Sequence, residues 1–160
     1  MVERLIYRGM FNIRGVVLGL LMLTSLASCG SYEYNVSEPL QPYVNEFLDI
    51  LETNDIKFKK KDFYVEFSDN LIGTPLAGYA DGMHDSSVVR VYLLRSYWNT
   101  LSEKQRKILI YHELSHDMFD SLHTYEVFIM QPKMHSRFVA EYINWDWAVS
   151  ELIKYIKNER

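Results

Sequence analysis

The chain has 160 residues and a net charge of −4, from 17 lysines and arginines against 21 aspartates and glutamates. Hydrophobic residues make up 48% and charged residues 24%, which is typical of one globular domain and too apolar for a disordered chain. The acidic balance argues against nucleic-acid binding, and the single cysteine excludes a disulfide within the chain. We therefore expect a folded monomer without a nucleic-acid partner.

Residues 1–28 have the order of features found in a secretory leader. Three arginines precede an apolar run over residues 16–26, which is too short to span a bilayer as a mature helix. The run ends in Leu26-Ala27-Ser28-Cys29, which resembles a bacterial lipobox, where a peptidase cuts before a cysteine that carries diacylglycerol. We predict a lipoprotein signal peptide over residues 1–28, with Met1 or Met10 as its start, and lipidation of Cys29.

A lipid on Cys29 predicts a protein of the cell envelope that faces away from the cytoplasm and has the membrane as a partner. Gly30 follows Cys29, where an aspartate often retains lipoproteins in the inner membrane, so the sequence favours the outer membrane. Residues 29–41, which contain serines, asparagine and proline, are expected to form a tether. The folded domain is then expected over residues 42–160.

Hydrophobic periodicity predicts an α+β fold. Apolar residues at helical spacing indicate a helix over residues 42–52, and alternation of β-branched and aromatic residues indicates strands over 62–67 and 87–94. A possible capping box at Ser102 and Gln105 predicts the start of a helix that ends at Asp120 and Ser121. A last helix is predicted from Ser136 to about Ile156.

The central helix carries the motif His112-Glu113-Leu114-Ser115-His116. Residues four apart lie on the same face of a helix, so both imidazoles can reach one Zn²⁺. Glu113 follows the first histidine and can take a proton from a zinc-bound water. The motif therefore predicts a hydrolytic zinc site with His112 and His116 as metal ligands and Glu113 as the general base.

A catalytic zinc site needs a third protein ligand and an open position. His123 lies just after the predicted end of the helix, where a turned chain can bring its ring back to the metal. Asp120 and Glu141 are alternative third ligands, one a turn past His116 and the other on the last predicted helix. The two remaining histidines, His84 and His135, are expected to be surface residues.

Residues 88–132 resemble the zincin metalloproteases, in particular the metzincin branch, in which the zinc motif is followed by a methionine-containing turn. Ile129-Met130-Gln131-Pro132 resembles that Met-turn, with Met130 as the apolar floor beneath the metal. The spacing of His123 is similar to that in small bacterial lipoproteins classed as metallopeptidases. The sequence departs from the family pattern at Ser115 and Phe119, where glycines are usual.

The resemblance implies a metzincin-type domain with a small twisted mixed sheet, an active-site helix, a Met-turn and a C-terminal helix. It also implies one catalytic Zn²⁺, a peptide or protein substrate, and His112, His116 and His123 as zinc ligands. The strand over 88–94 is expected to border the cleft and pair with an extended substrate, and the alternative is a core strand that is paired on both sides. The alternative is an inactive zinc-binding or adhesion lipoprotein on the same scaffold.

Overall fold

The computed structural model describes residues 34–158, with the exception of 60–61, 86 and 134. The predicted signal peptide and Cys29 lie outside these residues. The described chain is a mixed α+β unit whose elements follow in the order β1 (Tyr34–Val36), η2 (Glu38–Leu40), α1 (Gln41–Thr53), β2 (Asp62–Phe67), η3 (Asp69–Leu71), β3 (Gly78–Ala80), β4 (Val88–Leu93), α2 (Arg95–Trp98), α3 (Glu103–Phe119), η4 (Phe128–Met130), α4 (Arg137–Tyr142) and α5 (Trp145–Asn158).

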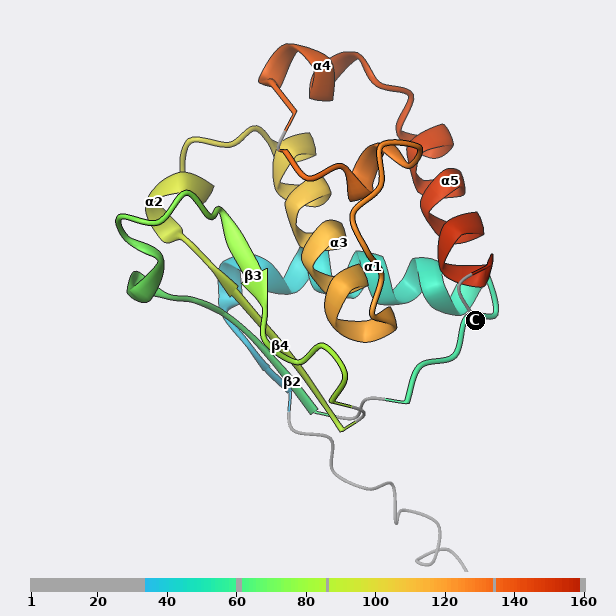
Figure 1. Cartoon of the computed structure of the whole chain (residues 1–160), viewed down its shortest axis with the longest axis horizontal. Coiled ribbons are helices and arrows are strands. Elements are labelled where there is room, and N and C mark those ends of the chain that lie inside the picture. The colour runs from blue at the N-terminus through green and yellow to red at the C-terminus, as the bar shows by residue number, and fades with distance from the viewer. Residues whose placement is uncertain (1–33, 60–61, 86, 134, 159–160) are drawn as a thin grey trace, which may run out of the picture. The chain divides into compact units, whose positions relative to one another are not determined.

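The four strands form one mixed sheet in the order β1-β2-β4-β3 (Figure 1). The strands β1, β2 and β4 are parallel, and β3 pairs with β4 in the antiparallel direction. The expectation that residues 88–94 form the free edge of the sheet is wrong, because β4 is paired on both sides. In the described sheet the edge strands are β1 and β3, and the edge next to α3 is β3. This three-residue strand gives no clear sequence signal because glycine and proline lie around it.

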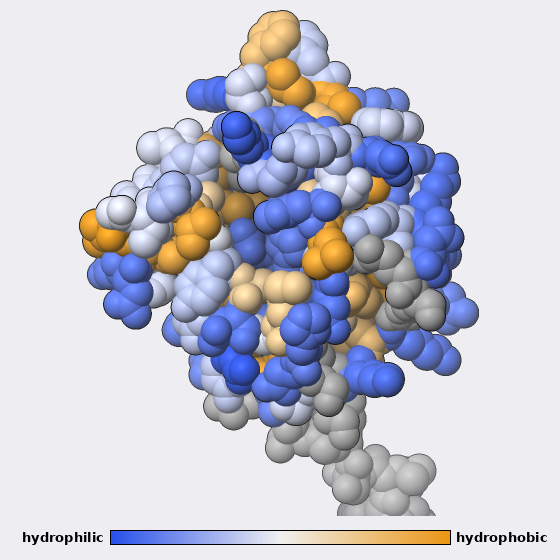
Figure 2. All heavy atoms as spheres, viewed as in Figure 1, coloured by the Kyte–Doolittle hydropathy of each residue, from blue (hydrophilic) through white to orange (hydrophobic). Residues whose placement is uncertain are grey.

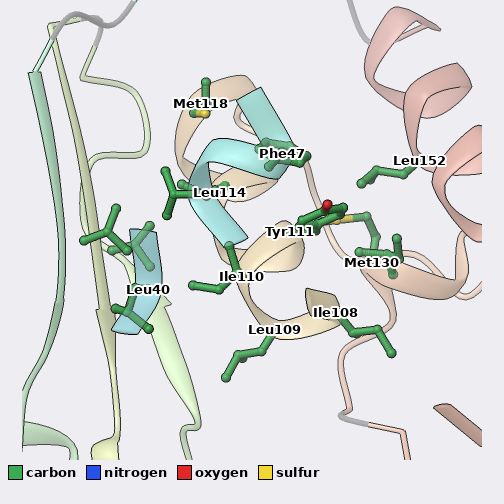
Figure 3. Close-up of a cluster of buried hydrophobic side chains, with 14 of the residues drawn as sticks. Leu40, Phe47, Ile108, Leu109, Ile110, Tyr111, Leu114, Met118, Met130 and Leu152 are labelled. Atoms are coloured by element: carbon green, nitrogen blue, oxygen red, sulfur yellow. The ribbon is translucent and has the colours of Figure 1, made fainter. Parts of the chain in front are cut away.

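The core lies on one face of the sheet, under α1 and α3 (Figure 1). Inward positions of β2 and β4 are buried, as the alternation of apolar residues predicted. On the far side of α3, η4 and α5 complete the packing, and Figure 3 shows Met130 and Leu152 there beside Tyr111. The largest fully buried side chains include Tyr111, Phe47, Leu40, Leu51, Leu93, Ile110 and Leu114.

The helix that carries the zinc motif is bounded as its end signals predict. The Ser102 hydroxyl accepts the Gln105 N–H at 3.4 Å, and Gln105 Oε1 accepts the Ser102 N–H at 3.1 Å, so the capping box is present. At the other end Asp120 has a φ of 54°, a left-handed conformation in which a helix stops. These two signals place α3 within one residue of its predicted limits.

Two segments differ from their sequence predictions. The stretch expected as a tether already belongs to the fold from Tyr34 onward, because β1 pairs with β2 and Leu40 is fully buried. The predicted last helix is two helices, since Ile143 has a ψ of 140° and interrupts it. Asn144 restarts the helix, and its Oδ1 accepts the Trp147 N–H at 3.0 Å.

A buried carboxylate holds α3 against the sheet. Asp117 is fully buried and accepts the backbone N–H of Gly82 at 2.7 Å and that of Arg90 at 3.0 Å. Gly82 belongs to the loop between β3 and β4, and a Cβ there would overlap with the Asp117 carboxylate. Asp117 therefore fixes α3 to the backbone of the β3–β4 strand pair.

We expect Asp117→Ala to lower the free energy of unfolding by about 2–4 kcal/mol, because two backbone N–H groups lose their acceptor. Denaturant unfolding in the presence of a chelator measures this change without a contribution from bound metal. Asp49→Ala, at an exposed position on α1, is the control and should change the value by no more than about 0.5 kcal/mol. Equal effects of the two substitutions would contradict the role of Asp117.

Candidate metal centre

Three histidines meet at the C-terminal end of α3. His112 and His116 lie one turn apart on this helix, and the chain reverses after Asp120 so that His123 faces them. The Nε2 atom of His112 is 3.0 Å from Nε2 of His116 and 3.1 Å from Nε2 of His123. One ligand atom from each ring lies within 4.8 Å of the others, so these residues are close enough to hold one metal ion.

The opposite nitrogens of two rings are held by backbone carbonyls. Nδ1 of His112 lies 2.8 Å from the carbonyl oxygen of Ile129, and Nδ1 of His116 is bonded to that of Ser121. A carbonyl can only accept, so each Nδ1 carries the proton. In the neutral rings both Nε2 atoms then present lone pairs. Lone pairs that face one another at 3.0 Å repel, and a cation between them removes that repulsion.

Burial is the main cause that lowers the pKa of His112 to about 4, and the neighbouring His116 and His123 lower it further. The bond to the Ile129 carbonyl acts in the opposite direction and is outweighed. The His112 ring is therefore neutral at pH 7. Neutral imidazole is the form of histidine that coordinates metals.

Glu113 points into the same cavity as the three histidines. Its side chain is buried, and this burial raises its pKa to about 8. Gly78 of β3 lies directly against it, since a Cβ at this position would be 3.0 Å from Oε1 of Glu113. The absence of a side chain at Gly78 thus lets the edge strand approach the carboxyl group.

The cavity has a volume of about 770 Å³ and lies between β3, α3 and the segment that follows η4. The segment before β3 and β3 itself line the cavity from Thr74 to Ala80, and Gln131, Pro132, Lys133 and His135 line it after η4. Its other lining residues include Leu94, Tyr97, Ile108, Leu109 and Leu122. The histidine cluster therefore borders a space large enough for part of a polymeric substrate.

Met130 lies in η4 and is fully buried. Its carbonyl oxygen accepts the N–H of Thr124 at 3.0 Å, which ties the loop of His123 to η4. The preceding residue, Ile129, supplies the carbonyl that holds His112. The turn around Met130 is thus connected to the histidine cluster through the backbone. The Met130 side chain lies beside Tyr111 (Figure 3).

The alternative third ligands lie elsewhere. Asp120 accepts the backbone N–H of His84 at 2.6 Å, and Glu141 is exposed on α4, outside the cluster of possible ligands. His84 is exposed, as predicted. His135 is not a simple surface residue: it is half-buried, lines the cavity and stacks on Phe128 with ring centroids 3.7 Å apart. A histidine after Pro132 gives no periodic signal that could have indicated this contact.

We expect the chain to bind one Zn²⁺ and expect His116→Ala and His123→Ala to weaken zinc binding at least about 100-fold, because each removes a ligand. Asp120→Ala is the matched control for the alternative ligand and should bind zinc as the unsubstituted chain does. Competition with a chromophoric chelator measures the affinities. Loss of zinc in Asp120→Ala with retention in His123→Ala would overturn the ligand set.

Comparison of the chain with protein-family models, with curated proteins and with solved structures found no match. Inference about function therefore depends on the arrangement of the described residues. In that arrangement three imidazoles converge beside a buried carboxyl group, at the wall of a cavity whose other side is the free edge of a sheet.

Proposed function

We propose that the protein is a zinc-dependent peptidase of the zincin type. The observation that carries this proposal is the convergence of three histidine Nε2 atoms in the cavity that also contains Glu113. A metal-binding cluster alone fits a storage or structural role, but a buried carboxyl group next to the cluster supports hydrolysis. The open cavity supports a substrate larger than water.

The donor set fits zinc. Zn²⁺ favours nitrogen ligands in a tetrahedral arrangement, and its catalytic sites use three protein ligands and leave a fourth position open. The carbonyl groups of Ile129 and Ser121 orient two of the rings, as outer partners do in zinc sites. When bound, zinc supplies Lewis-acid chemistry, which acidifies water and polarises a peptide carbonyl.

Glu113 supplies the proton transfers in this proposal. It follows His112 on α3 and lies in the cavity, and a cation held by the three histidines would lower the pKa that burial raises, so the group would be a carboxylate able to accept the proton of the attacking water. The same group then donates that proton to the nitrogen of the leaving amine. Burial and the contact with Gly78 hold the carboxyl group in place, which reduces the reorganisation that each transfer requires.

The edge strand β3 is suited to bind the substrate backbone. At the two ends of the β3–β4 ladder, the N–H of Leu94 donates to the carbonyl oxygen of Ala77, and the N–H of Asp81 donates to that of Arg90. In this register the backbone N–H and C=O groups of odd-numbered residues point toward β4. By the alternation of an antiparallel ladder, the N–H and C=O groups of Gly78 and Ala80 face the free edge. An extended peptide can add there as a further strand, in the cavity and beside Glu113.

The remaining parts of the proposal come from the sequence. Met130 is proposed as the Met-turn residue, and its complete burial next to the site supports this role. Lipid attachment at Cys29 is proposed to anchor the peptidase in the cell envelope, with the outer membrane favoured by Gly30. None of the described helices has the length and apolar character needed to cross a bilayer.

We expect Glu113→Ala to retain zinc but to lose a factor of about 10²–10⁴ in the rate of peptide cleavage, because the general base is absent. Cleavage of a broad peptide library, followed by mass spectrometry, measures this loss, and a chelator should abolish the activity of the unsubstituted chain.

Glu126→Ala, at an exposed position outside the cavity lining, is the control and should cleave normally. Normal turnover by Glu113→Ala would reject the assigned base. A zinc-loaded chain that cleaves no peptide at all would instead favour the inactive zinc-binding protein that the sequence leaves open.

We expect Ala80→Pro to lower kcat/KM for extended peptides about 2–10-fold, because proline removes one outward donor from the edge of β3. The melting temperature should stay close to that of the unsubstituted chain. Tyr79→Pro is the matched variant and removes a donor that faces β4, so it should destabilise the fold. A normal kcat/KM in a folded Ala80→Pro variant would argue against substrate pairing at β3.

A further inference from the structure

The described chain begins at the end of the sheet where all three parallel strands begin. The strands β1, β2 and β4 are parallel, and the register pairs Tyr34 with Phe63 and Asp62 with Val88. The three strands therefore start at one end of the sheet, the lower end in Figure 1. Cys29 precedes Tyr34 by five residues, which span at most roughly 18 Å when fully extended.

A group of lysines lies at the same end. The loop that leads from α1 into β2 contains four lysines within residues 57–61, although the whole chain is acidic. The structure describes Lys57 and Lys59, and both are exposed. Between them Phe58 packs edge-on against Phe63 of β2, with centroids 6.0 Å apart, and so fixes the loop to the start of the sheet.

We call the exposed residues Lys57 and Lys59 the lysine surface. The groove at the end of α1 contains Lys157, but Glu46, Asp49 and Asp146 line it as well, so it is not part of this surface. Lysines outnumber aspartates by four to two between Asp55 and Asp62, so the loop has a local positive charge.

We propose that the lysine surface docks on anionic phospholipid headgroups next to the lipid at Cys29. The short connection keeps this end of the sheet close to the bilayer, and the positive charge complements an anionic leaflet. A lysine near such a surface contributes about fivefold to partitioning, and a lipid combined with a basic patch anchors more firmly than either alone. The proposal is independent of peptidase activity.

Docking at this end orients the rest of the molecule. The helix α4 lies at the opposite end of the fold from the starts of the parallel strands (Figure 1). Its exposed apolar residues, which form one of the orange areas in Figure 2, include Phe138 and Val139. With the lysine surface at the bilayer, these residues face away from it.

The test uses the full lipidated chain in vesicles of neutral phosphatidylcholine or of phosphatidylcholine with 30 mol % phosphatidylglycerol, a composition we choose for strong negative charge. An environment-sensitive fluorophore is placed at Thr53→Cys or, as the distant site, at Tyr142→Cys on α4. Quenching by spin-labelled lipid should be at least twofold stronger at position 53 in the anionic vesicles. It should be equal in both vesicles at position 142.

Lys57→Glu with Lys59→Glu should reduce docking at least about tenfold and return the quenching at position 53 to its neutral-vesicle level. A high salt concentration should do the same for the unsubstituted lysines. Lys133→Glu with Arg137→Glu changes the net charge equally near α4 and should leave the quenching unchanged. Lys57→Gln with Lys59→Gln should give an intermediate value.

Three outcomes would overturn the proposal. Electrostatic docking would be excluded if quenching at position 53 were the same in neutral and anionic vesicles, or the same with and without the lysine substitutions. Stronger quenching at position 142 would mean that the opposite end meets the bilayer. A free thiol at Cys29 in the purified chain would remove the anchor on which the docking depends. Each of these outcomes leaves the peptide-cleavage tests unaffected.

Discussion

The hydrogen bonds from His112 and His116 to two backbone carbonyls determine what the candidate centre can do. They fix the proton on Nδ1 of each ring and direct both Nε2 lone pairs into the histidine cluster. The acceptors come from Ile129 and Ser121, in segments that follow α3 along the chain. The order of the site therefore depends on how the chain returns after the helix, and the turn around Met130 secures that return by its burial.

The sequence predicts the helical half of the site well, because its information is local. The capping box predicts where α3 begins, and the separation of four residues predicts that His112 and His116 lie on one face of it. The structure confirms both predictions. The sequence leaves three candidates for the third ligand, His123, Asp120 and Glu141, because the path of a loop depends on long-range packing. In the structure His123 lies in the histidine cluster, whereas Asp120 accepts the backbone N–H of His84.

The sheet shows where local reasoning fails. β4 has a clear alternating pattern, but the pattern does not reveal whether the neighbours of a strand are present, so its predicted place at the edge was wrong. The true edge, β3, has three residues and begins at Gly78, which resembles a loop in sequence. Gly78 weakens the strand signal, and its lack of a side chain is also what leaves room for the carboxyl group of Glu113.

The position of His123 outside the helix has a consequence for the metal-free chain. This residue is exposed, and it follows α3 by only a few positions. An ion shared by His123 and two helix residues would close a short loop in the folded chain, and its binding would stabilise the folded state relative to the unfolded one. Because the chain has a single cysteine and so no internal disulfide, the supply of metal would then determine how readily proteases cleave this segment.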